Sequence, residues 1–171
     1  MKRRLLVALA LVGLLSAVLI SQAGAATQTT SPVTTIADGS GVGSSTLTRT
    51  ASRISFTLQT SGLEPGHAVT VWWMVANPDT SVSVLYAAGH VIDKSGTAEF
   101  GAALKVGDTK GVVSLPGLST EGLLDAAAAD VYLVVRDHGP AKRGIVNQQI
   151  HTFGVCNPTC TDLQMSVHLA S

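Results

Sequence analysis

The stretch Val131–Ile150, VYLVVRDHGPAKRGIVNQQI, carries the clearest β-strand pattern in the chain. Its first six residues alternate between two faces, with Val131, Leu133 and Val135 on the same side. Such alternation is typical of a strand that lies with one face on a hydrophobic core. The polar residues RDHGP that follow predict a turn, after which a second and more polar strand is expected to run towards Phe153.

Short segments with comparable alternation occur on both sides of this stretch. The predicted strands are 45–50, 54–60, 69–75, 82–92, 98–104 and 163–168. In the last of them Leu163, Met165 and Val167 are expected to face the core, and Gln164, Ser166 and His168 are expected to face outward. About seven or eight short antiparallel strands predict an all-β fold, namely an antiparallel two-sheet sandwich of the immunoglobulin-like, Greek-key type.

The segment Lys105–Asp130 interrupts this rhythm, because it is too long for an ordinary connection between strands. It predicts one crossover segment laid against a sheet, with a short helix over 119–129 that begins at Ser119. We expect this crossover to cover the side chains of Trp72 and Met74.

Residues 1–25 have the three parts of a secretory signal peptide, namely a basic start, an apolar run and a small-residue cleavage site. The apolar run is shorter than the roughly 20 residues that span a bilayer. An uncleaved membrane anchor is the alternative. The predicted division of the chain is a signal peptide over 1–25, a flexible linker rich in Thr, Ser and Gly over 26–43, and a β-sandwich domain over 44–171.

Cleavage near Ala25 predicts a secreted or periplasmic protein without a membrane segment. Removal of three basic residues with the signal leaves 8 of the 11 Lys and Arg residues against 11 Asp and Glu residues, a net charge of −3. A chain of this charge with no basic patch is not expected to bind nucleic acid.

Several segments resemble the strand and turn pattern of CHRD (chordin-type) domains. The matching segments are Ile54–Leu63 (ISFTLQTSGL), Leu123-Leu124, Asp130–Val135 (DVYLVV) and Gly144–Ile150 (GIVNQQI). The chain is also similar to secreted bacterial proteins that carry a late cysteine pair. The resemblance implies an immunoglobulin-like barrel without common catalytic residues. It departs from the family at Pro65-Gly66-His67-Ala68, where a single histidine replaces a histidine-rich segment.

Cys156 and Cys160 are the two cysteines of the chain. In an oxidising compartment two such cysteines are expected to form a disulfide. The loop that this bond closes is very short, so its entropic contribution to stability is about 2 kcal/mol.

A copper site is the alternative use of the late Cys and His residues. His151, Cys156, Cys160 and His168 lie close in sequence, with Met165 between them, and Cys-x-x-x-Cys with a distant histidine resembles the copper site of Sco-type assembly proteins. Soft sulfur and imidazole ligands suit copper(I). Two observations argue against a metal site. The Sco-type proteins have a thioredoxin-like fold, which the strand pattern of this chain does not support, and the expected disulfide would remove both thiolates. No cofactor is therefore predicted.

Trp72, Met74, Arg136, Asp137 and His138 form a possible ligand surface. The neighbouring residues Trp72 and Trp73 must point to opposite faces of a strand, so one of them is outside the core unless the crossover covers it. An exposed tryptophan stacks well on a sugar or on an apolar side chain of a partner. The polar turn around His138 has a plainer interpretation as backbone turn chemistry.

No Gly-x-Ser-x-Gly nucleophile motif occurs in the chain, and its serines lie in predicted strands and loops. A hydrolase is therefore the third choice, after binding and copper. The sequence predicts a non-catalytic protein with a binding or structural role outside the cell, whose partner is an extracellular protein or polysaccharide.

Overall fold

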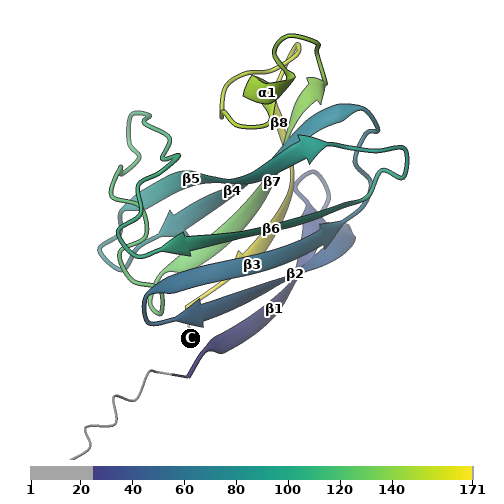
Figure 1. The fold of residues 1–171 in the computed structure, drawn as a ribbon. Coiled ribbons are helices and arrows are strands. Elements are labelled where there is room, and N and C mark those ends of the chain that lie inside the picture. Colours follow the sequence, from purple (N-terminus) through teal and green to yellow (C-terminus); the bar gives the residue numbers. More distant parts are fainter. Residues whose placement is uncertain (1–24, 171) are drawn as a thin grey trace, which may run out of the picture.

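The computed structural model describes residues 25–170, and the predicted signal peptide lies almost entirely outside these described residues. Eight strands and one short helix are present there (Figure 1). They are β1 (Thr27–Thr35), β2 (Gly41–Thr50), β3 (Arg53–Thr60), β4 (His67–Ala76), β5 (Val82–Val91), β6 (Ala98–Lys105), β7 (Asp130–Pro140), α1 (Val146–Gln149) and β8 (Thr161–His168). No helix within this range is long and apolar enough to cross a membrane.

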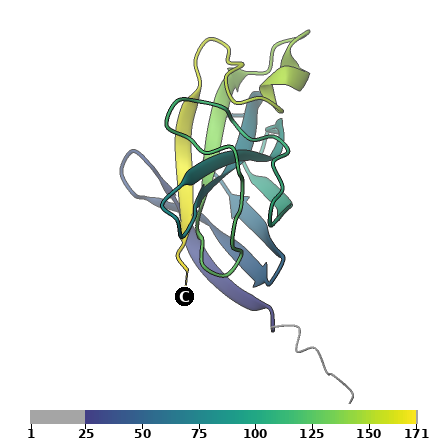
Figure 2. The ribbon, with the colours of Figure 1, turned by 90° about the vertical axis from the view of Figure 1, so that its left-hand side faces the viewer.

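All eight strands belong to one antiparallel sheet in the order β5-β4-β7-β8-β1-β2-β3-β6. The sheet curls until its edge strands β5 and β6 approach each other, as Figures 1 and 2 show from two sides. The predicted all-β, antiparallel fold is confirmed, and its form is a nearly closed barrel. The curling buries one face of every strand and leaves a seam at β5 and β6, where the described residues form no hydrogen-bonded ladder.

The core lies between the facing walls of this curled sheet. Trp73 of β4 and Phe56 of β3 meet edge to face with their ring centroids 4.7 Å apart. The predicted inward faces of these two strands are confirmed by their burial. Ile54, Phe56, Leu58, Val69, Val71, Trp73 and Val75 are all at most 4% exposed. Strand β7, whose Leu133 is fully buried, lies between β4 and β8 in the sheet.

Strand β1 occupies the segment for which the sequence predicts a flexible linker. It pairs with β2 along most of its length and with β8 at Thr34 and Thr35. Val33 is fully buried there. Threonine is common in strands because its branched side chain packs well on a pleated surface, so the Thr-rich composition fits a strand as well as a linker.

The prediction that Gln164, Ser166 and His168 face outward is wrong. These three side chains are at most 2% exposed, whereas Met165 and Val167 are half-buried. Buried polar groups are tolerated where they are hydrogen-bonded. Gln164 accepts a bond from the Thr60 hydroxyl at 2.6 Å and donates to the Ser61 carbonyl at 2.9 Å.

The predicted helix over 119–129 does not form. Residues 105–130 run through turns and an isolated bridge between Val112 and Leu85, and they face the viewer in Figure 2. Gly122 has a positive φ of 75°, which no helix accepts. The side chain of Asn77 holds the segment instead, since its amide donates to the Gly122 carbonyl and accepts from the Leu124 N–H.

The more polar strand expected to run towards Phe153 is also absent. Strand β7 continues through Pro140, and the chain then forms α1 and a series of turns above the end of the sheet (Figure 1).

Candidate functional site

The outer face of β4 holds Trp72, which is only 2% exposed. The ring of Phe153 covers it at a centroid distance of 5.1 Å, and Tyr86 lies at 5.6 Å, both nearly perpendicular to it. The tryptophan is therefore covered by Phe153, which comes from the segment before β8, and by Tyr86 of β5. Met74 is 36% exposed and lines a small recess with Trp72 and Phe153.

The charged groups of Arg136 and Asp137 are both bonded to other residues of the fold. The Arg136 guanidinium lies 4.2 Å from the centre of the Phe153 ring and donates to Asp162 at 2.6 Å. Asp137 accepts bonds from His67 Nδ1 at 2.8 Å and from the Gly139 N–H at 2.7 Å. The expected ligand surface around Trp72 therefore offers few unpaired polar groups.

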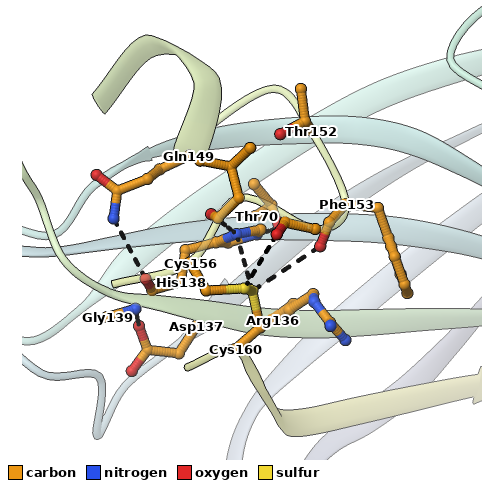
Figure 3. The surroundings of a disulfide bond; sticks show 12 residues. Thr70, Arg136, Asp137, His138, Gly139, Gln149, Thr152, Phe153, Cys156 and Cys160 are labelled. Carbon is orange, nitrogen blue, oxygen red and sulfur yellow. Dashed lines mark hydrogen bonds between the residues drawn. A yellow bond between two sulfur atoms is a disulfide. The ribbon is translucent and has the colours of Figure 1, made fainter. Parts of the chain in front are cut away.

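His138 is fully buried at the end of β7 and forms a defined hydrogen-bond chain (Figure 3). Its Nδ1–H donates to the Val155 carbonyl at 2.9 Å, and its Nε2 accepts from the Thr70 hydroxyl at 2.8 Å. Thr70 in turn accepts from Trp72 Nε1–H at 2.6 Å. Because a carbonyl only accepts, Nδ1 must carry the proton. Burial lowers the pKa of His138, so the ring is neutral near pH 7.

The turns after β7 rest on the backbone around His138. Gln149 is fully buried, and its amide donates to the carbonyls of His138 and Pro140. The Asn157 N–H donates to the His138 carbonyl at 2.8 Å. Gly139 has a φ of 78°, and a Cβ there would run into the Asn157 carbonyl. This packing holds the loop before β8 against the end of β7.

Cys156 and Cys160 form the predicted disulfide, with their Cα atoms 5.2 Å apart. Cys160 Sγ lies 3.4 Å from His138 Nδ1 (Figure 3). The ligand atoms of His138, Cys156 and Cys160 all lie within 4.8 Å of one another. The histidines that the sequence grouped with these cysteines lie elsewhere. His151 is exposed and bonds the Asn147 carbonyl, and His168 is buried among other side chains.

Sequence reasoning assigned His138 to a surface and not to the cysteine pair. The proximity of His138 to the cysteines follows from the pairing of two strands, in which Asp137 of β7 lies opposite Thr161 of β8. Cys160 comes directly before Thr161 and His138 directly after Asp137, so the two must lie opposite each other.

His168 belongs to a polar cluster inside the barrel together with Thr29, Ser45 and Ser166. Its Nδ1 lies 2.8 Å from Thr29 Oγ1, its Nε2 lies 2.8 Å from Ser45 Oγ, and Ser45 also bonds Ser166. Burial, with a smaller contribution from the nearby Arg49 guanidinium, lowers the pKa of His168 to about 4.

A groove of about 640 Å³ opens along the seam between β5 and the walls formed by β2, β3 and β6. Ser44, Gln59 and Glu99 lie side by side across β2, β3 and β6, because Gln59 is paired with both of the others. All three are exposed, and no hydrogen bond joins their side chains to other described residues. His90 and Asp93 also line the groove.

The half-buried His90 ring stacks on Phe100 of β6 with ring centroids 4.5 Å apart and planes 19° from parallel. Burial lowers the pKa of His90, and the Asp93 carboxylate opposes this effect. The Asp93 carboxylate also accepts bonds from the Ser95 backbone N–H and hydroxyl, which form the turn between β5 and β6. Sequence reasoning missed this groove because its residues come from four strands and follow no motif.

Comparison of the chain with protein-family models, with curated proteins and with solved structures finds no match. The geometry alone defines the class of protein: an antiparallel, barrel-like all-β protein with a polar groove at its seam.

Proposed function

We propose that this is a secreted, non-catalytic binding protein that holds a hydroxyl-rich polysaccharide segment in the groove at the seam. The observation that carries the proposal is the row of exposed, unpartnered polar side chains across three neighbouring strands, namely Ser44, Gln59 and Glu99. A volume of about 640 Å³ falls in the usual range of roughly 300–1,000 Å³ for small-ligand sites.

The groove offers the chemistry that sugar hydroxyls require. The Glu99 carboxylate accepts hydrogen bonds, whereas the Gln59 amide and the Ser44 hydroxyl both donate and accept. A neutral His90 adds one donor and one acceptor, and its ring, which rests on Phe100, supplies a flat surface for stacking. The carboxylates Asp93 and Glu99 favour a neutral or cationic sugar over an anionic one.

Secretion, the immunoglobulin-like arrangement and the CHRD-like relationship are parts of the same proposal. The signal-like pattern of residues 1–25 and the disulfide support export, since disulfides persist in oxidising compartments. Two of the CHRD-like segments, Ile54–Leu63 and Asp130–Val135, fall on β3 and β7 of the single sheet.

The test is a screen of the mature chain against immobilised neutral, cationic and anionic polysaccharides, followed by calorimetry on the best ligand. Glu99→Gln keeps the shape of the side chain and removes its charge. We expect it to weaken binding roughly tenfold, because a hydrogen bond to a charged group contributes about 1.5–3 kcal/mol. Glu121→Gln, at an exposed position in the 105–130 segment, is the matched control and should bind as the wild type does.

Chemical-shift changes on ligand addition should concentrate on β2, β3, β5 and β6. Binding to a protein partner alone, shift changes confined to the Trp72 face, or equal affinity of the Glu99→Gln and wild-type chains would each refute the proposal.

A further inference from the structure

The end of β7 and the loop before β8 bring together one imidazole nitrogen and two sulfur atoms, from His138, Cys156 and Cys160. We propose that reduction of the Cys156–Cys160 disulfide by a dithiol opens a copper(I) site formed by these three side chains. In the oxidised protein the disulfide closes the loop and no thiolate is present. This inference concerns residues of β7 and of the loop before β8, none of which lines the groove, and it does not depend on carbohydrate binding.

The spacing of the three atoms matches a metal site. With metal–sulfur bonds of about 2.3 Å and metal–nitrogen bonds of about 2.0 Å, neighbouring ligand atoms stand about 3.5–4 Å apart. His138 Nδ1 and Cys160 Sγ are already 3.4 Å apart. Only the two sulfur atoms must separate, and side-chain rotation achieves this because the Cα atoms are 5.2 Å apart.

The hydrogen bonds of His138 allow the required change of tautomer. In the oxidised protein Nδ1 carries the ring proton and donates it to the Val155 carbonyl. On metal binding, Nδ1 loses this proton to solvent and Nε2 takes one up. Nε2–H then donates to Thr70 Oγ1, which has a second lone pair for Trp72 Nε1–H, and the Thr70 hydroxyl hydrogen turns away from the ring. A hydrogen bond of this kind orients a ligating imidazole.

The electrons and protons of the complete change balance. The dithiol is oxidised to its own disulfide, and its two electrons and two protons convert Cys156 and Cys160 into thiols. Each thiol then releases a proton to solvent as its sulfur binds the copper ion. Two thiolates and copper(I) leave one net negative charge. Arg136, whose guanidinium lies over the Phe153 ring and pairs with Asp162, is a cation beside this loop (Figure 3).

Copper(I) fits this donor set better than zinc does. Soft thiolate ligands select copper(I), which is satisfied by two or three donors. Zinc in structural sites takes four, and the group contains three ligating side chains within the described part of the chain. The rings of Phe153 and Trp72 pack against each other, and Trp72 bonds to Thr70, the hydrogen-bond partner of His138.

The test begins with the complete mature chain, reduced by a dithiol that is then removed under anaerobic conditions. Copper(I) is titrated in competition with a chromophoric copper(I) chelator, and the same titration is run with zinc. We expect one copper(I) per reduced chain, a sulfur-to-copper absorption band in the ultraviolet, and an unchanged β-sheet circular dichroism spectrum. The oxidised chain should bind at least about 100-fold more weakly, because its thiolates are absent.

Substitutions test whether Cys156, Cys160 and His138 are the copper ligands. Cys156→Ser with Cys160→Ser should abolish the absorption band. His138→Asn keeps a donor for the Val155 carbonyl but removes the imidazole, and should weaken copper binding at least tenfold. His151→Asn is the matched control and should bind as the wild type does. If His138→Asn does not fold, ¹⁵N spectra of the wild type decide, because copper must then shift the ring nitrogens of His138 and leave those of His151 in place.

The proposal is refuted if reduction unfolds the chain or if the reduced and oxidised chains bind copper equally. It is also refuted if zinc binds more tightly than copper(I), if His138→Asn binds as the wild type does, or if the His138 ring signals do not move.

Discussion

Acidification should destabilise this fold through His168, and the size of the effect follows from its surroundings. The ring is 2% exposed and bonded to Thr29 and Ser45 inside the barrel. Both hydroxyls could accept a proton from a charged ring, so hydrogen bonding does not oppose protonation. The protonated ring of His168 is disfavoured because it loses its hydration on burial and is repelled by the Arg49 guanidinium. Together these effects lower the pKa of His168 from 6.5 to about 4.

A folded-state pKa below the unfolded value means that the unfolded chain binds the proton more tightly. The contribution of neutral His168 to stability is therefore complete above pH 6.5 and is lost as the pH falls from 6.5 towards 4. The whole loss amounts to about 3 kcal/mol, and about 2 kcal/mol of it falls between pH 7 and pH 5. The lowered pKa values of His138 and His90 act in the same direction, whereas Asp38, with a pKa of about 2, acts below this range.

The assay is urea unfolding of the oxidised chain at several pH values between 5 and 7, followed by tryptophan fluorescence. His168→Gln stays neutral throughout, so its free energy of unfolding should fall by about 2 kcal/mol less than that of the wild type over this range. The exposed His151→Gln variant is the control and should keep the wild-type pH dependence. The reasoning is refuted if the His168→Gln and wild-type curves run parallel.

Three further predictions test the packing, the first of them with a matched control. Gly139→Ala should lower the free energy of unfolding by at least about 2 kcal/mol in urea, whereas Gly66→Ala, with a similar φ but no atom near its Cβ, should cost about 1 kcal/mol from backbone strain alone. Arg49→Met should cost about 3 kcal/mol by thermal unfolding, because three carbonyls lose a buried donor. Asn77→Ala should speed hydrogen exchange and proteolysis within 105–130 while the exchange of the sheet stays unchanged.

Much of the sheet could be predicted from the sequence, because alternation reports directly which face of a strand is buried. The faces of β3 and β4 followed from residues such as Phe56 and Trp73. The single curled sheet could not be predicted, because alternation is identical in a sandwich and in a barrel. The choice between them depends on which strands pair, and here β8 pairs with β1 from the far end of the chain.

The candidate sites were harder to predict, since each combines distant segments. The groove joins Ser44, Gln59 and Glu99 only through the pairing of three strands. In the same way, His138 meets Cys160 because β7 and β8 pair, although 22 residues separate them. The earlier grouping of Cys160 with His151 and His168 relied on closeness in sequence, which says little about closeness in a sheet built from long-range pairs.

The buried polar face of β8 shows why the alternation of polar and apolar residues can mislead inside a curled sheet. The pattern assigns polar residues to solvent because an isolated polar group is costly to bury, and that cost disappears when a partner is present. Gln164 meets Thr60, and His168 meets Ser45, so each inward polar residue of β8 is matched by one on another strand. If these pairs set the register of β8, Gln164→Leu should destabilise the fold despite its apolar side chain, because the Thr60 hydroxyl would lose its buried acceptor. The free energy of unfolding should fall by about 1–3 kcal/mol in urea, and a stabilised variant would show that apolar burial outweighs the pairing.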